Sequence, residues 1–152
     1  MTNQRNRITL DEPEQRSLLE TARTLQIASI SPDGRPHLVP MWFALDEDGL
    51  IVFTTYGSSQ KVLNLERDSR ITVLVEAGDA YNELRGLAID GTAEVVRDAR
   101  VTWYTGVRIG EKYRGVPWPT TVNASAEPPP TKRVTIRVHP QRTRSWDHRK
   151  LG

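Results

Sequence analysis

The residues best suited to holding an anion lie at positions 56–61, where the chain reads YGSSQK. An apolar run ends at Thr54 and Thr55, a glycine allows a sharp reversal, and a helix is expected to follow. The free N–H groups of a first helical turn, and the positive end of its dipole, favour a negative group. Two serine hydroxyls and the mobile charge of Lys61 add to that preference. The stretch indicates a phosphate site, and the alternative is an ordinary helix cap with a surface lysine.

A second group of candidate residues is the run Pro40-Met41-Trp42-Phe43, on an expected strand at 36–45. Successive side chains of a strand face opposite ways, so one face of this run packs into a core. Core packing by Met41 and Phe43 is the alternative to a binding role. Pro40 cannot donate to a strand ladder, which indicates a sheet edge or a gap. Trp42 is the best candidate of the run for contact with a ligand.

Residues 131–150 are rich in basic side chains and contain one acid, Asp147. The basic residues are Lys132, Arg133, Arg137, Arg142, Arg144, Arg149 and Lys150. The planar guanidinium of Arg144 suits a phosphate or carboxylate, and the Trp146 ring is placed to cover a ligand from a partner subunit. A solvated strand face, with Trp146 as an anchor of the last strand, is the alternative. Nucleic-acid binding is not expected, because no reading motif accompanies the charge.

The remaining residue types with catalytic potential argue against a metalloprotein, a cysteine-dependent enzyme and a serine hydrolase. His37, His139 and His148 show no metal-ligand spacing, so no metal is expected, and His37 is expected at the surface or behind the ligand contacts. The chain has no cysteine, which excludes disulfides, thiolate metal sites and a cysteine nucleophile. The absence of a GxSxG pattern argues against a serine hydrolase.

The elements that must position these residues follow from periodicity and turn signals. Strands are expected at 25–30, 36–45, 50–55, 70–76, 84–96 (one strand or two), 131–139 and 143–146. Helices are expected at 13–22, at 58–67 with Ser58 as N-cap, and at 98–112. Short turns join the first three strands, which predicts an antiparallel meander, and Gly86 and Gly91 are candidate bulges. Many strands without a GxGxxG motif favour an antiparallel barrel over a Rossmann domain.

The length of 152 residues fits a single domain. Residues 1–10 are expected to be flexible and 115–130 to form a long loop, in which Trp118 favours a substrate-side lid over a linker. The formal net charge is +2, and no apolar run approaches the roughly 20 residues that span a bilayer. No N-terminal signal sequence is recognisable, so a cytoplasmic protein without membrane contact is expected.

The order of these motifs resembles the pyridoxamine 5′-phosphate oxidase-like split β-barrel family. The resemblance rests on the strand at 25–30, DGRPH at 33–37, PMWF at 40–43, SQK at 59–61, NL at 64–65 and DSR at 68–70. The resemblance covers the chain from about Leu18 to Gly152. More narrowly, the chain resembles an actinobacterial branch whose members bind the deazaflavin coenzyme F420. The arginine-rich motifs of true pyridoxamine phosphate oxidases are missing, so vitamin B6 oxidation is not expected.

The resemblance implies a mainly β fold, a six-stranded antiparallel split β-barrel with flanking helices. It also implies a homodimer with cofactor clefts between subunits, and F420 as the cofactor, with FMN as the alternative. The cofactor-binding residues that it implies are Pro40, Met41, Trp42, Thr54, Thr55, Ser58, Ser59, Gln60, Lys61, Arg144 and Trp146. No catalytic residue is identified from the sequence.

The function expected from this resemblance is hydride transfer between the deazaflavin and a small unsaturated or quinone-like substrate. In such enzymes the cofactor carries the hydride and the protein supplies binding and orientation, which agrees with the lack of an evident acid–base pair. Two alternatives stay open. One is an FMN-dependent flavin reductase of the same fold, and the other is a protein that binds or carries F420 without turnover.

Overall fold

The computed structural model describes residues 3–115 and 127–152. Its strands are β1 (Leu25–Ile30), β2 (Pro36–Met41), β3 (Ala44–Leu45), β4 (Ile51–Tyr56), β5 (Arg70–Ala77), β6 (Arg85–Val96) and β7 (Arg133–Asp147). Its α-helices are α1 (Gln4–Arg7), α2 (Glu12–Thr21), α3 (Gln60–Arg67) and α4 (Ala99–Arg114). Two short 3₁₀ turns are η1 (Tyr81–Glu83) and η2 (His148–Leu151).

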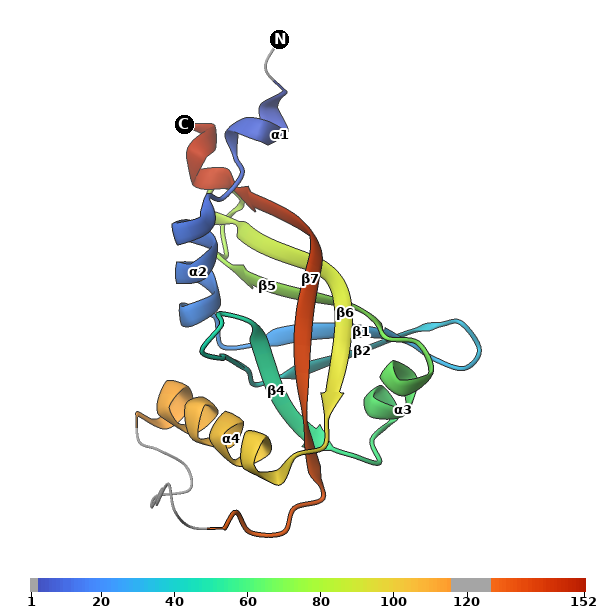
Figure 1. Cartoon of the computed structure of the whole chain (residues 1–152). Coiled ribbons are helices and arrows are strands. Elements are labelled where there is room, and N and C mark those ends of the chain that lie inside the picture. Colours follow the sequence, from blue (N-terminus) through green and yellow to red (C-terminus); the bar gives the residue numbers. More distant parts are fainter. Residues whose placement is uncertain (1–2, 116–126) are drawn as a thin grey trace.

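The strands form one sheet in the order β2-β1-β5-β6-β7-β4-β3, and every neighbouring pair is antiparallel. β2 and β3 stand at opposite ends of this order, yet only Trp42 and Phe43 separate them in the chain. Three steps from Met41 to Ala44 span at most about 11 Å. The sheet therefore has to curl back on itself, as Figure 1 shows, and the result is a split β-barrel with flanking helices.

The described residues contain seven strands rather than the six that the family resemblance implies. The segment 36–45 breaks at Trp42-Phe43 into β2 and β3, whereas the segments at 131–139 and 143–146 belong to the single strand β7. The bulge expected at Gly91 is confirmed, because the β6–β7 register shifts between Asp90 and Gly91. A Cβ at Gly91 would lie 2.2 Å from the carbonyl oxygen of His139, so the close approach of the strands requires glycine here.

The expected meander of the first three strands is confirmed only in part. β1 pairs with β2, and the two residues of β3 pair with the start of β4, but along most of its length β4 pairs with β7 and none of it pairs with β2. Local turn signals predict hairpins between consecutive strands, whereas the β4–β7 pair joins segments far apart in the sequence. This long-range pair matters for the site, because it sets Arg133 opposite Tyr56.

The barrel interior is filled by alternate side chains of the strands, and α2 and α3 contribute to it. Leu25 and Ile27 of β1 are fully buried, and burial of such a side chain stabilises the fold by about 1.5–3 kcal/mol. A capping box between Asp11 and Glu14 starts α2, whose Leu18 reaches the core.

Helix α4 lies outside the barrel against β4 and β7 (Figure 1). The Asp98 carboxylate accepts the N–H groups of the first turn, and the helix ends at Gly115 with φ of 71°. The buried face of α4 meets the sheet through hydroxyl groups, since the Thr135 Oγ1 atom lies 3.0 Å from Thr102 Oγ1 and 3.4 Å from Thr105 Oγ1.

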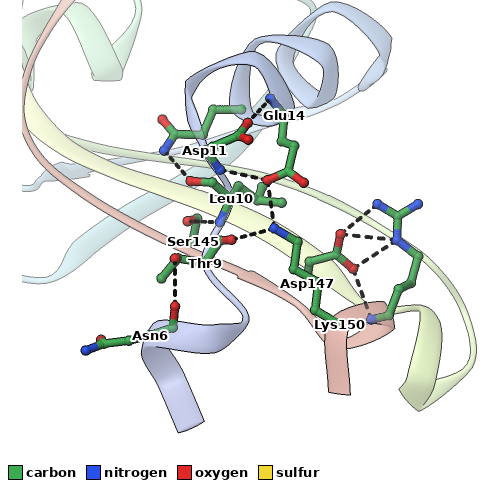
Figure 2. Close-up of polar contacts among 10 residues, drawn as sticks. Asn6, Thr9, Leu10, Asp11, Glu14, Ser145, Asp147 and Lys150 are labelled. Carbon is green, nitrogen blue, oxygen red and sulfur yellow. Dashed lines mark hydrogen bonds and ion pairs between the residues drawn. The ribbon is translucent and has the colours of Figure 1, made fainter. Parts of the chain in front are cut away.

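The two ends of the chain are joined to each other, as Figure 2 shows. The Leu10 N–H donates to Ser145 Oγ at 2.9 Å, and Lys150 Nζ donates to the Thr9 carbonyl and to Glu14 Oε2, both at 2.8 Å. Within the first ten residues, for which flexibility is expected, Leu10 is buried in the core cluster.

Candidate functional site

The start of α3 leaves backbone donors open. The helix begins at Gln60 with Ser59 as its N-cap, one residue later than expected. The reason is a turn closed by the Ser59 N–H and the Tyr56 carbonyl, which holds Ser58 exposed ahead of the helix. In the part of the chain that the structure describes, the N–H groups of Gln60 and Lys61 donate to no protein acceptor. These are the donors that a helix N-terminus offers to an anion.

Lys61 places a half-buried cation beside these donors. Its Nζ donates to Thr55 Oγ1 at 2.9 Å, and the same oxygen lies 3.4 Å from Ser59 Oγ. Burial lowers the pKa of Lys61, and the positive charge of Arg133 lowers it further. Thr55, Ser59 and Lys61 are therefore brought together as predicted, and the ammonium is held in a position that costs it solvation.

Arg133 is the second cation of this site. It stands opposite Tyr56 in the β4–β7 register, with its guanidinium carbon 4.4 Å from the Tyr56 ring centroid. Across residues 3–115 and 127–152, no carboxylate forms an ion pair with Lys61 or Arg133. Two neighbouring cations without an acid are a favourable place for a phosphate or another anion.

Gln60, also predicted to bind the phosphate, uses its side chain differently. Its Nε2 donates to Asn64 Oδ1 at 2.8 Å, and Asn64 is fully buried and donates to Ser29 Oγ at 3.1 Å. The side chain thus connects α3 to β1. The backbone N–H of Gln60 remains available to a ligand.

A cavity of about 250 Å³ opens beside Arg133, between the β2–β3 break, β4 and α4. Its lining residues are Met41, Trp42, Thr54, Ile109, Gly110, Arg114 and Arg133. The predicted residues Met41, Trp42 and Thr54 are therefore brought together. Pro40 is not among the lining residues and stands exposed on β2.

A second cavity of about 260 Å³ adjoins the first, since Thr54 and Arg133 line both. Its other lining residues are Ala99, Thr102, Trp103, Gly106, Pro129, Pro130 and Thr131. Apolar walls with a few convergent polar groups are the usual composition of small-molecule sites. The two cavities and the open donors at Lys61 fit a phosphorylated ring cofactor.

The break between β2 and β3 is held by α4. The Trp42 ring stacks on Tyr113 at a centroid distance of 4.4 Å and an interplanar angle of 10°. The Phe43 N–H donates to the Tyr113 hydroxyl at 3.3 Å, and that hydroxyl donates to the Arg23 carbonyl at 2.8 Å. Arg114 lies 5.9 Å from the Trp42 ring. Trp42 therefore presents a fixed, half-exposed ring at the cavity.

Arg144 and Trp146 do not join these residues within one chain. Arg144 pairs with Asp90 at 2.8 Å, and the Trp146 ring covers Gly86, where a Cβ would lie 2.2 Å from a ring atom. Along β7 they lie eleven or more residues beyond Arg133, roughly 35 Å in an extended strand. They line a separate cavity of about 610 Å³ with the N-terminal segment. Within one chain they are therefore separate from Lys61 and Arg133.

Three further predicted features stand apart from the site. His37 lies on β2, and its Nδ1 is buried without a hydrogen-bond partner. Trp118 and most of its connection lie outside the described residues. The structure, over the ranges that it describes, contains no group of three or more His, Asp or Glu side chains arranged to hold a metal.

Sequence reasoning missed Arg133, Tyr113 and Trp103. Arg133 was one of several basic residues near the C-terminus, and only the long-range β4–β7 pair distinguishes it. Tyr113 and Trp103 lie on the expected helix at 98–112 or just past it, where periodicity assigns no partner. Tyr113 and Trp103 could be found by looking for aromatic residues on the face of the expected helix that meets the barrel.

The fold is that of the split β-barrel class, and Lys61 and Arg133 beside the open start of α3 give it a candidate anion site. The chain belongs to the pyridoxamine 5′-phosphate oxidase family, whose sequence pattern matches residues 11–147. No curated protein matches it. Among the described helices, none is long and apolar enough to cross a membrane.

Solved structures agree with this assignment. The conserved hypothetical protein Rv2991 of Mycobacterium tuberculosis is 41% identical, with a TM-score of 0.87 over 99% of this chain and 93% of that one. An F420 reductase is 29% identical, with a TM-score of 0.61 over 84% of this chain and 93% of that one. An FAD-binding protein of Mesorhizobium loti, 19% identical, shares the fold with a TM-score of 0.65 over 90% of this chain and 94% of that one.

Proposed function

We propose that the protein is an F420-dependent reductase that transfers hydride from the deazaflavin to a small unsaturated or quinone-like substrate. The observation that carries the proposal is the pair of cations Lys61 and Arg133, which lack an acid partner and stand beside the open first turn of α3. This arrangement suits the phosphate of a flavin-type cofactor. The similarity to an F420 reductase supports the choice of deazaflavin.

Each residue of the site has a simple task in this proposal. Lys61 and Arg133 bind the phosphate with the N–H groups at the start of α3, and Thr55 and Ser59 position the Lys61 ammonium. Trp42 forms an apolar wall for the ring. The bound cofactor supplies the hydride, and the protein supplies orientation and the exclusion of water.

The proposed active unit is a homodimer. Arg144 and Trp146 reach the cofactor from the second subunit, where Arg144 meets an anionic group and Trp146 covers the ring. F420 carries an anionic tail that FMN lacks, so a basic residue from the second subunit favours F420. This supplies the reason to prefer F420 over the alternative FMN.

Titration of the apo-protein with F420 and with FMN, followed by cofactor fluorescence, tests the proposal. We expect micromolar or tighter binding of F420 and weaker binding of FMN. Binding of neither cofactor overturns the proposal, and tighter binding of FMN supports a flavin reductase instead. Reduced F420 with a panel of quinones and enones then separates an enzyme from a carrier, because only an enzyme reoxidises the cofactor at a catalysed rate.

A further inference from the structure

Lys112, in the last turn of α4, holds its ammonium against an aromatic ring and a helix end. Its Nζ lies 3.4 Å from the centroid of the Phe43 ring and donates to the Leu19 carbonyl at 3.0 Å. Leu19 belongs to the last turn of α2, where carbonyl groups lack intrahelical partners. An ammonium has three N–H donors, so one carbonyl and one ring face replace only part of its hydration.

The same side chain lines a cavity of about 420 Å³ between α2, β3 and α4, here called the Lys112 cavity. Leu19, Ala44 and Leu45 form its apolar walls. Its other lining residues are charged, namely Arg16, Glu20, Asp46, Arg108 and Glu111. Arg16 and Arg108 each form an ion pair with a carboxylate, whereas Lys112 forms none with any residue in the ranges 3–115 and 127–152. The cavity therefore contains an amine that no acid holds in its charged form.

The surroundings of Lys112 favour the neutral amine. Burial lowers its pKa to about 8, the positive charge of Arg23 lowers it further, and the carboxylate of Glu20 opposes both effects. An ordinary lysine has a pKa of about 10.4 and is almost entirely an ammonium at neutral pH. A neutral, partly desolvated lysine amine is a nucleophile. Lys112 thus combines a reactive amine with space for a small electrophile.

The contacts of Nζ decide which class of electrophile fits. An amide keeps one N–H for the Leu19 carbonyl and removes the poorly solvated charge. A neutral imine, formed with an aldehyde, has no N–H and leaves that carbonyl without its partner. A carbamate, formed with carbon dioxide, keeps the N–H but adds a negative charge beside Glu20, Asp46 and Glu111. Acylation is the modification that the site favours.

We infer that Lys112 is an acylation site, which accepts a small acyl group from an acyl phosphate or an acyl thioester. The amine attacks the acyl carbonyl carbon and a C–N bond forms. The bond from that carbon to the phosphate oxygen or to the thiol sulfur breaks, its electron pair leaves with the phosphate or thiolate, and the amine proton passes to water. The amide N–H then donates to the Leu19 carbonyl, and the acyl group lies against Ala44 and Leu45. This inference does not rest on the proposed function.

Other lysines of the chain provide internal controls for the test. Lys132 is exposed, and Lys150 is held by Glu14 at 2.8 Å. The full chain is incubated near pH 8 with acetyl phosphate and, separately, with acetyl-coenzyme A, and acetylation of each lysine is followed by peptide mass spectrometry. Lys112 should be acetylated about tenfold faster than Lys132, because its larger neutral fraction outweighs its lower basicity. Lys61 is left out of the comparison, since burial lowers its pKa as well.

The donor that acetylates Lys112 preferentially identifies the source of the acyl group, and preference with either donor supports the inference. The rate at Lys112 should reach half of its maximum near pH 8, whereas the rate at Lys132 should rise to about pH 10. Acetylation of Lys112 no faster than that of Lys132 with both donors would overturn the inference. A pH profile at Lys112 equal to that of Lys132 would also overturn it.

A variant that fills the Lys112 cavity tests whether the donor enters there. Leu45→Trp places a larger side chain in the cavity wall and should slow the acetylation of Lys112 severalfold while leaving Lys132 unchanged. Leu63→Trp, at an exposed leucine of α3 that does not line this cavity, is the matched control. An unchanged rate at Lys112 in folded Leu45→Trp would overturn the assignment to this cavity. The rates and pH profiles of the unmodified protein decide the inference if Leu45→Trp does not fold.

Discussion

At the scale of single residues, Lys61 is the clearest link between an unfavourable position and a function. Its ammonium is half-buried next to Arg133, and both burial and the second cation lower its pKa. Neither effect helps the free protein to fold. A bound phosphate reverses the repulsion, which is why a pair of cations without an acid indicates a ligand site better than a salt bridge does.

The first prediction concerns Lys61→Ala. Loss of one charge-assisted contact should weaken cofactor binding by about 1.5–3 kcal/mol. The free energy of unfolding should not fall, because the substitution also removes a desolvated charge. Fluorescence titration and urea unfolding measure the two quantities. Arg35→Ala is the control, since Arg35 is an exposed cation of the β1–β2 turn that contributes to neither cavity nor to the start of α3. An unchanged dissociation constant in Lys61→Ala would place the phosphate elsewhere.

The second prediction concerns Lys112, whose Nζ lies 3.4 Å from the Phe43 ring centroid and donates to the Leu19 carbonyl at 3.0 Å. Burial, with a smaller effect of Arg23, lowers its pKa to about 8. Between about pH 8 and 10 the unfolded chain therefore binds more protons at this lysine than the folded one does. Lys112 thus makes the free energy of unfolding rise with pH in this window.

Urea unfolding at several pH values from 8 to 10 measures this slope. Lys112→Met should show a flatter slope than the unmodified protein, and Lys132→Met, which changes an exposed lysine, should not. The window ends near pH 10 because burial raises the pKa of Tyr113, so that tyrosine acts in the opposite direction above its ordinary pKa. Equal slopes in the Lys112→Met variant and the unmodified protein would contradict the assignment.

At the scale of elements, the end of α4 sets the position of the β2–β3 break. The Tyr113 hydroxyl accepts the Phe43 N–H and donates to the Arg23 carbonyl, and its ring supports Trp42. Tyr113→Phe keeps the stack but leaves both backbone groups without this partner. We expect a loss of about 1 kcal/mol in the free energy of unfolding, and weaker cofactor binding if Trp42 moves. Tyr104→Phe, on the same helix and exposed, is the matched control.

The elements also show where sequence reasoning succeeds. Helices α2, α3 and α4 appear within a few residues of their expected positions, because capping residues and periodicity are local signals. The β2–β3 break and the β4–β7 pair were not predictable in this way. Both depend on closure of the barrel, which brings together segments that share no local signal. For the same reason the sequence offers Lys61 and Thr55 as phosphate-site candidates but not Arg133, which comes near them only through the β4–β7 pair.

The junction of the two chain ends decides how the C-terminus should be tested. Asp147 is buried, and its N–H donates to the Ile8 carbonyl at 2.7 Å, while Ser145 and Lys150 hold the segment before α2 (Figure 2). Deletion of residues 145–152 should therefore destabilise the fold, measurable as a lower Tm.

Arg144→Ala is the sharper test of a cofactor contact. It should weaken F420 more than FMN, with a gap that shrinks as salt rises; equal losses for both cofactors would contradict that contact.

At the scale of the whole molecule, the free edge and outer face of β2 suggest where the second subunit packs. β2 is the terminal strand of the sheet order, and the side chains of Pro36, Leu38 and Pro40 are exposed on one face of it. Leu38 is 65% exposed, the second most exposed large apolar side chain among the described residues. The prolines cannot donate to a neighbouring strand, so face-to-face packing is favoured over extension of the sheet.

The last prediction is that Leu38→Asp converts a homodimer into a monomer. A carboxylate in the centre of an apolar interface loses solvation without gaining a partner, so association should weaken by several orders of magnitude. Analytical ultracentrifugation at micromolar concentration measures the change. Leu63→Asp, at an exposed leucine of α3, is the control and should remain a dimer. In the proposed shared cleft Arg144 and Trp146 come from the second subunit, so the Leu38→Asp monomer should also bind F420 more weakly. A monomeric unmodified protein that still binds F420 would exclude the shared cleft.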